Sequence, residues 1–275
     1  MISTSNQKPK IILIGGAEIS IENKPIGQLQ FGPENPGTIS VYCRGKAWTL
    51  ALDLLADGCH VDFVSVAGND FSGQAMKAQL YKLGIGVDHF HLIDGKDTAA
   101  RHEIMNLLDQ PEMEFQNCEV FDSMTTEMIE SATDLISAAD CIVLETRFPQ
   151  EVLEYVASTF SQKPILLLPD SPDSAAKAAS ILGEVKGILT GRREAEILSG
   201  LIILSEEELQ IAGEWFFEKG IGQVFFDLGF GGVYFKDRLE AGAKRPGPGR
   251  IACIVEGFVE NQSAAQSAED AINKR

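Results

Sequence analysis

The stretch Lys10-Ile-Ile-Leu-Ile-Gly-Gly-Ala17 is a short apolar run that ends on a pair of glycines. Such a run, bounded by a turn signal, is typical of a strand that is buried on both faces of a sheet. Apolar runs of similar size recur along the chain and alternate with amphipathic stretches of helical length. This alternation is the pattern of repeated βαβ units. It predicts an α/β fold with a mostly parallel central sheet and helices on both of its faces.

The apolar runs predict strands at Lys10–Gly15, His60–Val66, Cys141–Glu145, Pro164–Leu168, Gly187–Thr190, Gln223–Leu228 and Gly232–Lys236. The amphipathic stretches predict helices at Ala47–Asp57, Gly73–Lys82, Thr125–Ala138, Gln150–Phe160, Ser174–Leu182, Glu194–Ser199, Glu206–Lys219 and Ile251–Asn261. Two segments, 20–42 and 98–120, break the alternation because they combine β-forming residues with turn signals. We expect both to leave the layered body and to form a small β-lid. Its place would be beside the carboxyl ends of the main strands, where ligands bind in open α/β sheets.

The composition is that of an ordinary globular protein, with 44% hydrophobic and 23% charged residues in a length of 275 residues. This length suits a single α/β domain over residues 1–275, with the lid included. The formal net charge of −17 argues against non-specific binding of nucleic acid and against attraction to a membrane surface. A phosphate-bearing ligand would therefore need a local positive group, such as a helix N-terminus, a lysine or a metal ion.

The five cysteines are scattered, odd in number and without a C-x-x-C pair, which is typical of reduced thiols. The sequence starts with a polar stretch rather than a secretory signal, and its longest apolar runs are far too short to span a bilayer. We therefore expect a cytoplasmic protein without a membrane segment.

The glycine-containing junctions each allow a purely structural interpretation when they are taken singly. Gly15 and Gly16 fit a tight turn, and they lack the G-x-G-x-x-G spacing of a dinucleotide site. Asn69 and Asp70 fit a turn followed by a helix N-cap. The segment 227–232 fits a hairpin between two strands.

Two other sequence features give no independent site. A P-loop is excluded at Gly45-Lys46, because Ala47 follows where Ser or Thr is required. His89 and His91 alternate on a predicted strand without a third metal ligand in register, which favours surface positions over a metal site.

The order of the junctions along the chain carries more information than any one of them. It runs Gly15-Gly16-Ala17, Arg44-Gly45-Lys46-Ala47, Ala67-Gly68-Asn69-Asp70-Phe71-Ser72-Gly73, Glu194-Ala195-Glu196 and Leu228-Gly229-Phe230-Gly231-Gly232. This order resembles the PfkB (ribokinase-like) carbohydrate kinase family, and the resemblance covers almost the whole chain. Asn35-Pro36-Gly37 and the stretch 113–122 look most like the pseudouridine-kinase branch of that family.

The resemblance implies a three-layer α/β/α body with a β-lid, in which the γ-phosphate of ATP is transferred to a hydroxyl of a small sugar or nucleoside with magnesium. The family's G-A-G-D motif holds the phosphoryl charge at a helix N-terminus, and its Asp removes the hydroxyl proton. The catalytic positions implied for this sequence are Gly247, Gly249 and Arg250. The implied substrate-binding positions are Gly16, Glu18, Ser20, Gly45, Lys46, Thr49 and Arg147. The implied nucleotide-binding positions are Glu194, Asp227, Gly229 and Gly232, and Glu194 is also the implied magnesium ligand.

The catalytic motif departs from the family pattern at its most important position. Arg250 stands where the family has its Asp. An arginine does not accept a proton at any relevant pH, and loss of a positioned base costs ~10²–10⁴-fold in rate. Pro248 also removes one backbone N–H from the anion hole, and the loss of one such donor costs ~10²–10³-fold.

Departures also occur at the sugar and metal positions. Glu18 and Ser20 replace the family's sugar-binding Asn and Asp, and Thr49 replaces the Asn that closes its second motif. In the N-x-x-E motif Gly191 replaces the Asn, so that only Glu194 remains. We also expect the family segment that helps to enclose adenine to be missing, because the sequence ends soon after the anion-hole helix.

Three interpretations of the function follow from these features. The first is an active ATP-dependent kinase that uses another base, with Asp170 and Asp227 as candidates. The second is a pseudokinase that binds a nucleotide, a sugar or a sugar phosphate, with the cationic Arg250 able to hold an anion. The third is a decayed product that folds without activity. We also expect a homodimer through the lid, because a small exposed sheet leaves edges and an apolar face to be covered.

Overall fold

The structure of the protein is a computed structural model, and it describes residues 8–237, 243–245, 251–259 and 267. The larger of its two sheets contains β1 (Lys10–Ile14), β4 (His60–Gly68), β5 (Phe90–Ile93), β8 (Cys141–Glu145), β9 (Ile165–Leu168), β10 (Gly187–Gly191), β11 (Gln223–Asp227), β12 (Val233–Asp237) and β13 (Ala243–Arg245). In the described part of the chain these strands lie in the order β13-β12-β11-β10-β9-β8-β1-β4-β5. The pairs from β5 across to β11 are parallel, and β12 and β13 are antiparallel to their neighbours.

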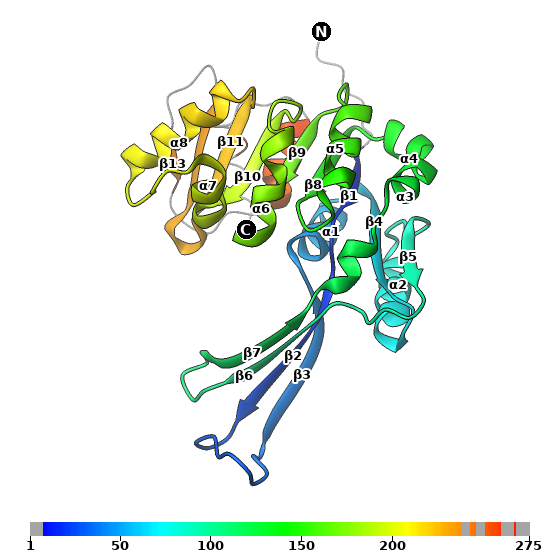
Figure 1. The fold of residues 1–275 in the computed structure, drawn as a ribbon, viewed down its shortest axis with the longest axis vertical. Coiled ribbons are helices and arrows are strands. Elements are labelled where there is room, and N and C mark those ends of the chain that lie inside the picture. The colour runs from blue at the N-terminus through cyan, green and yellow to red at the C-terminus, as the bar shows by residue number, and fades with distance from the viewer. Residues whose placement is uncertain (1–7, 238–242, 246–250, 260–266, 268–275) are drawn as a thin grey trace.

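Helices cover both faces of this sheet (Figure 1). One face carries α1 (Lys46–Ala56), α2 (Phe71–Leu83) and α9 (Ile251–Val259). The other face carries α3 (Thr126–Ser131), α4 (Thr133–Ser137), α5 (Gln150–Thr159), α6 (Pro172–Ala175), α7 (Arg192–Ser199) and α8 (Glu206–Glu218). Short 3₁₀ segments lie at Glu119–Ser123, Ala176–Ile181 and Gly229–Gly231.

The alternation of side chains along the central strands explains why both faces must be covered. In β1, Ile12 and Ile14 pack with one helical layer, and Ile11 and Leu13 pack with the other. All four side chains are fully buried. A strand that is apolar on both faces is stable only between two layers of helices. The predicted fold class, a three-layer α/β/α body with a mostly parallel sheet and a β-lid, is confirmed.

Apart from shifts of one or two residues at element ends, three differences from the predicted elements stand out. The helix predicted at Thr125–Ala138 is divided into α3 and α4 at Ala132. The helix predicted at Ser174–Leu182 begins earlier, at Pro172, and continues as a 3₁₀ helix. The sequence pattern predicts no strand at β13, because this three-residue strand is shorter than the window over which a pattern can be recognised.

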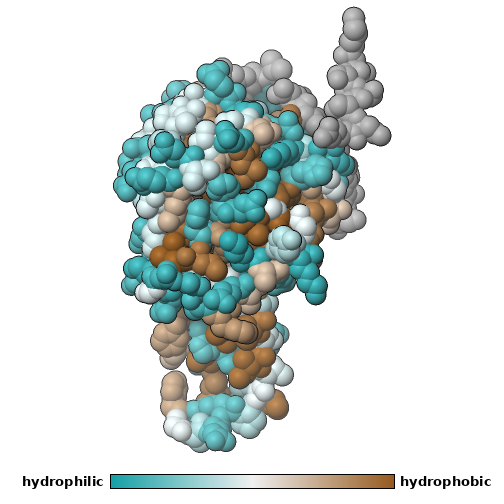
Figure 2. Space-filling model, turned by 90° about the vertical axis from the view of Figure 1, so that its right-hand side faces the viewer, coloured by the Kyte–Doolittle hydropathy of each residue, from teal (hydrophilic) through white to brown (hydrophobic). Residues whose placement is uncertain are grey.

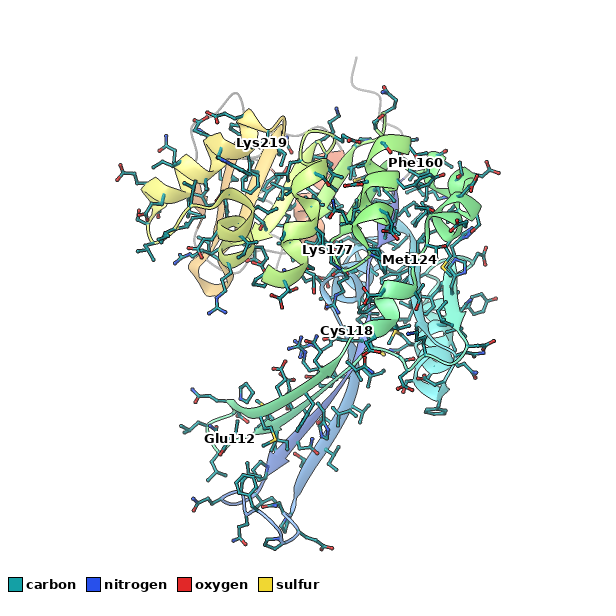
Figure 3. All side chains as sticks on the ribbon, in the orientation of Figure 1. Glu112, Cys118, Met124, Phe160, Lys177 and Lys219 are labelled. Atoms are coloured by element: carbon teal, nitrogen blue, oxygen red, sulfur yellow. The ribbon has the colours of Figure 1, made fainter. Side chains whose placement is uncertain are left out.

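The second sheet is the β-lid, and it projects from the body (Figure 1). It contains β2 (Glu18–Pro25), β3 (Gly37–Arg44), β6 (Ala100–Met105) and β7 (Pro111–Asn117), in the order β3-β2-β6-β7. Cys118 marks the point where β7 returns to the body, and Glu112 lies out on the lid (Figure 3).

The strand register gives the β-lid two different faces. One face places Val41, Ile21, His102 and Phe115 in one row across the four strands. The next row on this face contains Ile39, Asn23, Ile104 and Met113. The opposite face is polar and includes Glu18, Ser20, Arg101, Glu103 and Gln116. Figure 2 shows apolar side chains gathered over the narrow part of the molecule that the lid forms.

Two structural interpretations of the sequence are confirmed. Asp70 is the N-cap of α2, and its carboxylate accepts a hydrogen bond from the backbone N–H of Gly73 at 2.8 Å. The junction 227–232 connects β11 and β12 as an antiparallel hairpin, with Gly229 and Gly232 both at positive φ (58° and 101°). These conformations favour glycine.

Among the described residues, no helix is both long and apolar enough to cross a bilayer. Cys43, Cys59, Cys118 and Cys141 have free thiols. Burial raises the pKa of Cys59 to about 12, with a further contribution from its hydrogen bond to Glu256.

Candidate active site

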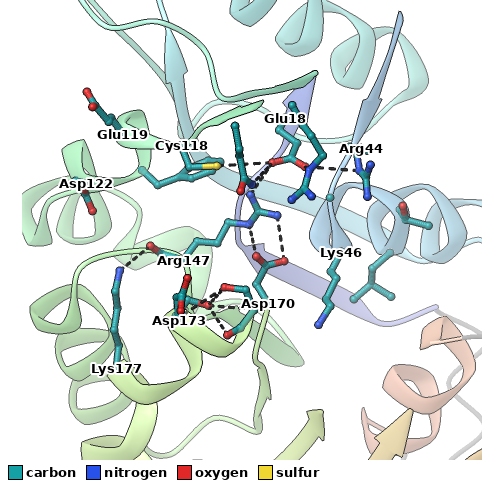
Figure 4. A pocket seen from close by; sticks show the side chains of 18 of the residues that line it. Glu18, Arg44, Lys46, Cys118, Glu119, Asp122, Arg147, Asp170, Asp173 and Lys177 are labelled. Carbon is teal, nitrogen blue, oxygen red and sulfur yellow. Dashed lines mark hydrogen bonds and ion pairs between the residues drawn. The ribbon is translucent and has the colours of Figure 1, made fainter. Parts of the chain in front are cut away.

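A cavity of about 940 Å³ lies between the carboxyl ends of the central strands and the polar face of the β-lid. Such a position is where ligands bind in open α/β sheets. Its walls are formed by Glu18, Arg44, Gly45, Lys46, Thr49, Leu50, Asp53, Arg101, Gln116, Cys118, Glu119, Phe121, Asp122, Arg147, Asp170, Ser171, Asp173, Ser174, Lys177 and Ile251. Most of these side chains are drawn in Figure 4.

Glu18 is a buried carboxylate surrounded by three arginines, and only 1% of it is exposed. The side-chain nitrogens of Arg147, Arg101 and Arg44 lie 3.1, 3.3 and 3.6 Å from its oxygens. Burial by itself would raise the pKa of Glu18, but the charge and hydrogen bond of Arg147 and the charges of Arg101 and Arg44 hold that pKa below its ordinary value. Glu18 is therefore ionised at neutral pH.

Arg147 follows β8 and lies across the floor of the cavity, between Glu18 and Asp170 (Figure 4). One terminal nitrogen donates a hydrogen bond to one carboxylate oxygen of Asp170 at 3.0 Å, and the Nε lies 3.0 Å from the other oxygen as an ion pair. The guanidinium also lies 5.1 Å from the centre of the Phe121 ring. Burial acts to lower the pKa of Arg147, but Glu145, Asp170 and Glu18 raise it above its ordinary value, so that the cation is permanent.

Glu145 is the last residue of β8 and is fully buried below Arg147. One of its oxygens accepts a hydrogen bond from the backbone N–H of Gly16 at 2.5 Å. Burial, together with the nearby charge of Asp170, raises the pKa of Glu145 to about 8. This carboxyl group therefore keeps its proton at neutral pH, although it lies within 3.6 Å of the Nε of Arg147.

The start of α1 forms another wall of the cavity. Gly45 precedes the helix at a φ of 127°, and a Cβ at this position would lie 2.9 Å from the backbone oxygen of Gly16. Lys46 is the first helical residue, and its Nζ donates a hydrogen bond to the backbone oxygen of Pro169 at 2.7 Å. Thr49, one turn further, also lines the wall.

The N-terminus of α9 faces the same cavity, because Ile251, its first residue, lies in the wall. The first turn of a helix presents backbone N–H groups and a partial positive charge, which favour an anion. Lys46 and the start of α9 therefore give one end of the cavity a positive character.

Glu194 lies in the first turn of α7, where its carboxylate is 3.6 Å from the Nζ of Lys46. Gly191 leaves room for this placement, since a Cβ at position 191 would overlap the Glu194 carboxylate. The described residues contain no group of three or more side chains that could hold a metal ion by themselves. Magnesium bound to nucleotide phosphates needs only one or two protein carboxylates, so Glu194 is compatible with the role of a single ligand.

The structure brings part of the predicted substrate site together at this cavity. Glu18, Gly45, Lys46, Thr49 and Arg147 line it, and Gly16 lies beside it under Arg147 and Phe121. Ser20 is fully buried, and its hydroxyl lies 3.4 Å from the Glu103 carboxylate instead of on the cavity wall.

The predicted nucleotide and catalytic positions lie elsewhere or are not described. Asp227, Gly229 and Gly232 are on the hairpin between β11 and β12 and do not line this cavity. The Asp227 carboxylate accepts a hydrogen bond from the backbone N–H of Gly229 at 2.9 Å. Gly247, Gly249 and Arg250 lie outside the described residues.

Several residues of the site were not singled out by the sequence patterns. Glu145 ends a predicted strand, so its place at the carboxyl edge of the sheet was a usable signal. Arg101 and Glu103 alternate along β6 and therefore share the polar face of the lid. Their contacts with Glu18 and Arg44 cross from one strand to another, and the register that makes these contacts is not contained in local sequence.

The fold is that of an α/β protein with a cavity between a mostly parallel sheet and a β-lid, and the first residue of α9 lies in the wall of this cavity. The family model described as "pfkB family carbohydrate kinase" matches residues 33–250. The chain therefore belongs to the pfkB family of carbohydrate kinases, and the family resemblance predicted from the glycine junctions is confirmed.

Relatives of known name agree with this assignment. Pseudouridine kinase from Escherichia coli is 24% identical over 231 residues, which is 84% of this chain and 74% of that protein. Ribokinase from Haemophilus influenzae is 24% identical over 235 residues, 83% of this chain and 71% of that protein. The structure of Arabidopsis thaliana ribokinase in complex with ribose and ATP superimposes with a TM-score of 0.82 at 16% identity, covering 96% of this chain and 90% of the other. A carbohydrate kinase from Agrobacterium tumefaciens gives a TM-score of 0.81 at 16% identity, covering 96% and 88%.

The buried Glu145 predicts a specific dependence of stability on pH. The folded protein keeps the Glu145 proton up to about pH 8, whereas the ordinary pKa of a glutamate is 4.5. Between these values the folded state binds more protons than the unfolded state, so the contribution of Glu145 lowers the free energy of unfolding as the pH rises, by at most about 1.4 kcal/mol per pH unit. Glu145→Gln removes this contribution while keeping an oxygen for Gly16.

Urea denaturation at several values between pH 5.5 and 7.5 measures the effect. The free energy of unfolding of wild type should fall relative to that of Glu145→Gln as the pH rises. Glu151→Gln, at an exposed position on α5, is the matched control and should follow wild type. Parallel curves for wild type and Glu145→Gln would contradict a neutral Glu145.

Proposed function

We propose that this protein is an ATP-dependent kinase that transfers a phosphoryl group to a hydroxyl of a neutral sugar or nucleoside, with a pseudouridine-like nucleoside as the first candidate. The observation that carries the proposal is the cavity itself. It combines a floor of buried carboxylates and arginine, suited to a polyhydroxylated ligand, with a positive end made by Lys46 and the start of α9. The similarity to Escherichia coli pseudouridine kinase supports the choice of substrate.

The charges around the cavity favour a neutral acceptor. The cationic side chains in its wall are Arg44, Lys46, Arg101, Arg147 and Lys177, and the acidic ones are Glu18, Asp53, Glu119, Asp122, Asp170 and Asp173. Since the two signs nearly balance, an anionic sugar would gain little net attraction. A guanidinium has five N–H donors. The contacts of Arg147 with Glu18 and Asp170 use three of its nitrogens once each, so that donors on its two terminal nitrogens are available for oxygen atoms of a ligand.

The positive end of the cavity would receive the phosphates of ATP. Lys46 would contact phosphate oxygens in place of its contact with Glu194, and the backbone N–H groups at the start of α9 would add hydrogen bonds. Magnesium, when bound, would neutralise charge on the phosphates, and Glu194 is our candidate for its protein ligand. The complex of Arabidopsis thaliana ribokinase with ribose and ATP supports this choice of cofactor.

Asp170 is the best candidate for the general base, because Arg250 does not accept a proton. Asp170 lines the cavity at the end of β9, whereas Asp227, the other candidate, does not line it. The hydrogen bond from a terminal nitrogen of Arg147 and the nearby Arg147 Nε, each at 3.0 Å, orient the Asp170 carboxylate. A base with these properties can accept the proton of a hydroxyl that binds beside Arg147.

This proposal is tested by an assay of ADP formation with pseudouridine, ribose and common nucleosides. Wild type should show turnover with at least one of them, and Asp170→Asn should lower the rate by ~10²–10⁴-fold, because it removes the base. Asp134→Asn, at an exposed position on α4, should leave the rate unchanged. Absence of ADP formation with the whole panel would reject an active kinase.

A pseudokinase is the second candidate, and a specific contact favours it. Lys46 and Glu194 form an ion pair with each other, and Gly191 has no side chain to offer a metal or phosphate. Under this alternative, calorimetry detects binding of a nucleotide, a sugar or a sugar phosphate without turnover. Activity gained by Arg250→Asp would then show that the rest of the site is intact, and continued absence of activity would show that the defect extends further.

We also propose that the chain acts as a cytoplasmic homodimer that pairs through the apolar face of the β-lid. Ile39, Val41 and Phe115 on this face are 71%, 64% and 58% exposed, which is unusual for contiguous apolar side chains of a monomer. The outer strands of the lid, β3 and β7, also have unpaired edges within the described chain. The lid of a second copy of the chain would cover the apolar face and the unpaired strand edges.

Size-exclusion chromatography with light scattering tests the dimer. Wild type should elute with twice the mass of one chain, and Val41→Asp should shift it to the monomer, because a charge would be buried in the interface. Thr38→Asp lies on the same strand, on the opposite face beside Lys24, and is the matched control that should remain dimeric. A monomeric wild type would reject the proposal.

A further inference from the structure

A continuous series of ion pairs crosses from the β-lid to the body of the protein. In the lid, Arg44 on β3 contacts Glu103 on β6 at 3.2 Å and Glu18 on β2 at 3.6 Å. Glu18 then contacts Arg147, after β8 of the body, at 3.1 Å. Arg147 in turn contacts Asp170, after β9, at 3.0 Å. The series therefore joins two strand ends of the central sheet to three strands of the lid.

The two central members of this series are the most buried. The side chains of Glu18 and Arg147 are 1% and 9% exposed, whereas that of Arg44 is 38% exposed. An ion pair with little access to water is weakly screened, and breaking it leaves an uncompensated charge. The Glu18–Arg147 contact is therefore the link in the series whose loss has the largest effect.

Arg147 itself is held in a fixed orientation. The Phe121 ring lies against its guanidinium, and Gly16 packs against its aliphatic part so closely that a Cβ would lie 2.7 Å from the Arg147 Cδ. Asp170 holds the other edge of the guanidinium through two contacts. Glu18 and Asp170 have no direct contact among the described residues, and Arg147 contacts both of them.

We propose that Arg147 is a positioning residue that couples the placement of the β-lid to the state of Asp170 at the floor of the cavity. A ligand group that binds Asp170 competes with Arg147 for its oxygens, which changes how firmly Arg147 holds Glu18 and, with it, the lid. This inference does not depend on the proposed phosphoryl transfer, because it concerns contacts that exist whether or not the protein is catalytically active.

The test uses amide hydrogen exchange measured by mass spectrometry on the full chain. The variant Asp170→Asn changes a residue of the body that has no described contact with the lid. In the wild-type background this variant should raise the exchange rate of β2 and β6 by about tenfold or more. The reason is that it weakens the charge-assisted contact of Asp170 with Arg147, which holds Arg147 in position against Glu18. In the background of Arg147→Met, the lid is already released from the body. Asp170→Asn should therefore not raise the exchange rate of β2 and β6 any further.

Two comparisons make the result specific. Asp173 also lies on the cavity wall, three residues beyond Asp170, and it has no described contact with Arg147. Asp173→Asn should therefore leave the exchange rate of the lid unchanged. Glu18→Gln should raise lid exchange to the level of Arg147→Met. The strands β8 and β9 are the internal reference for correct folding, and Arg147→Gln replaces Arg147→Met if the latter does not fold.

Two results would overturn the proposal. One is an effect of Asp170→Asn on the lid that is equal with and without Arg147, which would mean that the influence takes another route. The other is unchanged lid exchange in Asp170→Asn, which would mean that Arg147 contributes only local packing. Neither result bears on whether the wild-type protein forms ADP, which is the outcome that decides the proposed function.

Discussion

Glu18 is an ionised carboxylate removed almost completely from water, and such a group is tolerated only where other charges replace its lost hydration. Its partners are Arg44 and Arg101 from the lid and Arg147 from the body. Each of these arginines needs further acidic partners in turn, and this requirement extends the network to Glu103, Glu114 and Asp170. Much of the polar architecture around the cavity follows from compensating this single charge.

The contrast between Glu18 and Glu145 shows how strongly local surroundings determine the chemistry of one side chain. Both carboxyl groups are 1% exposed, and both lie near Arg147. Three cations keep the first ionised, whereas burial and the charge of Asp170 keep the second protonated at neutral pH. An ionised carboxylate therefore lines the cavity, and a neutral carboxyl group lies buried below Arg147.

The fold could be predicted from the sequence because local patterns carry it. The apolar runs that form β1 and β8 and the N-cap at Asp70 act within a few residues, and the structure has them where the patterns indicated. The site could be predicted only in part. Arg101 meets Glu18 because β2 pairs with β6 in parallel, and this pairing joins positions more than 80 residues apart. No local pattern contains that information. Arg147 and Asp170 meet for the same reason, since β8 and β9 are neighbours in the sheet.

Only three residues separate the first strand of the body from the β-lid, and the residue that opens the lid, Glu18, lines the cavity. The lid is therefore not a separable module. A deletion or exchange of lids between relatives would remove the carboxylate around which the floor is arranged and would leave Arg147 without one of its partners. Such a protein would lose the charge balance of the cavity floor as well as the lid itself. The lid and the floor of this cavity therefore depend on the same carboxylate, so that a change of residue in one alters the charge balance of the other.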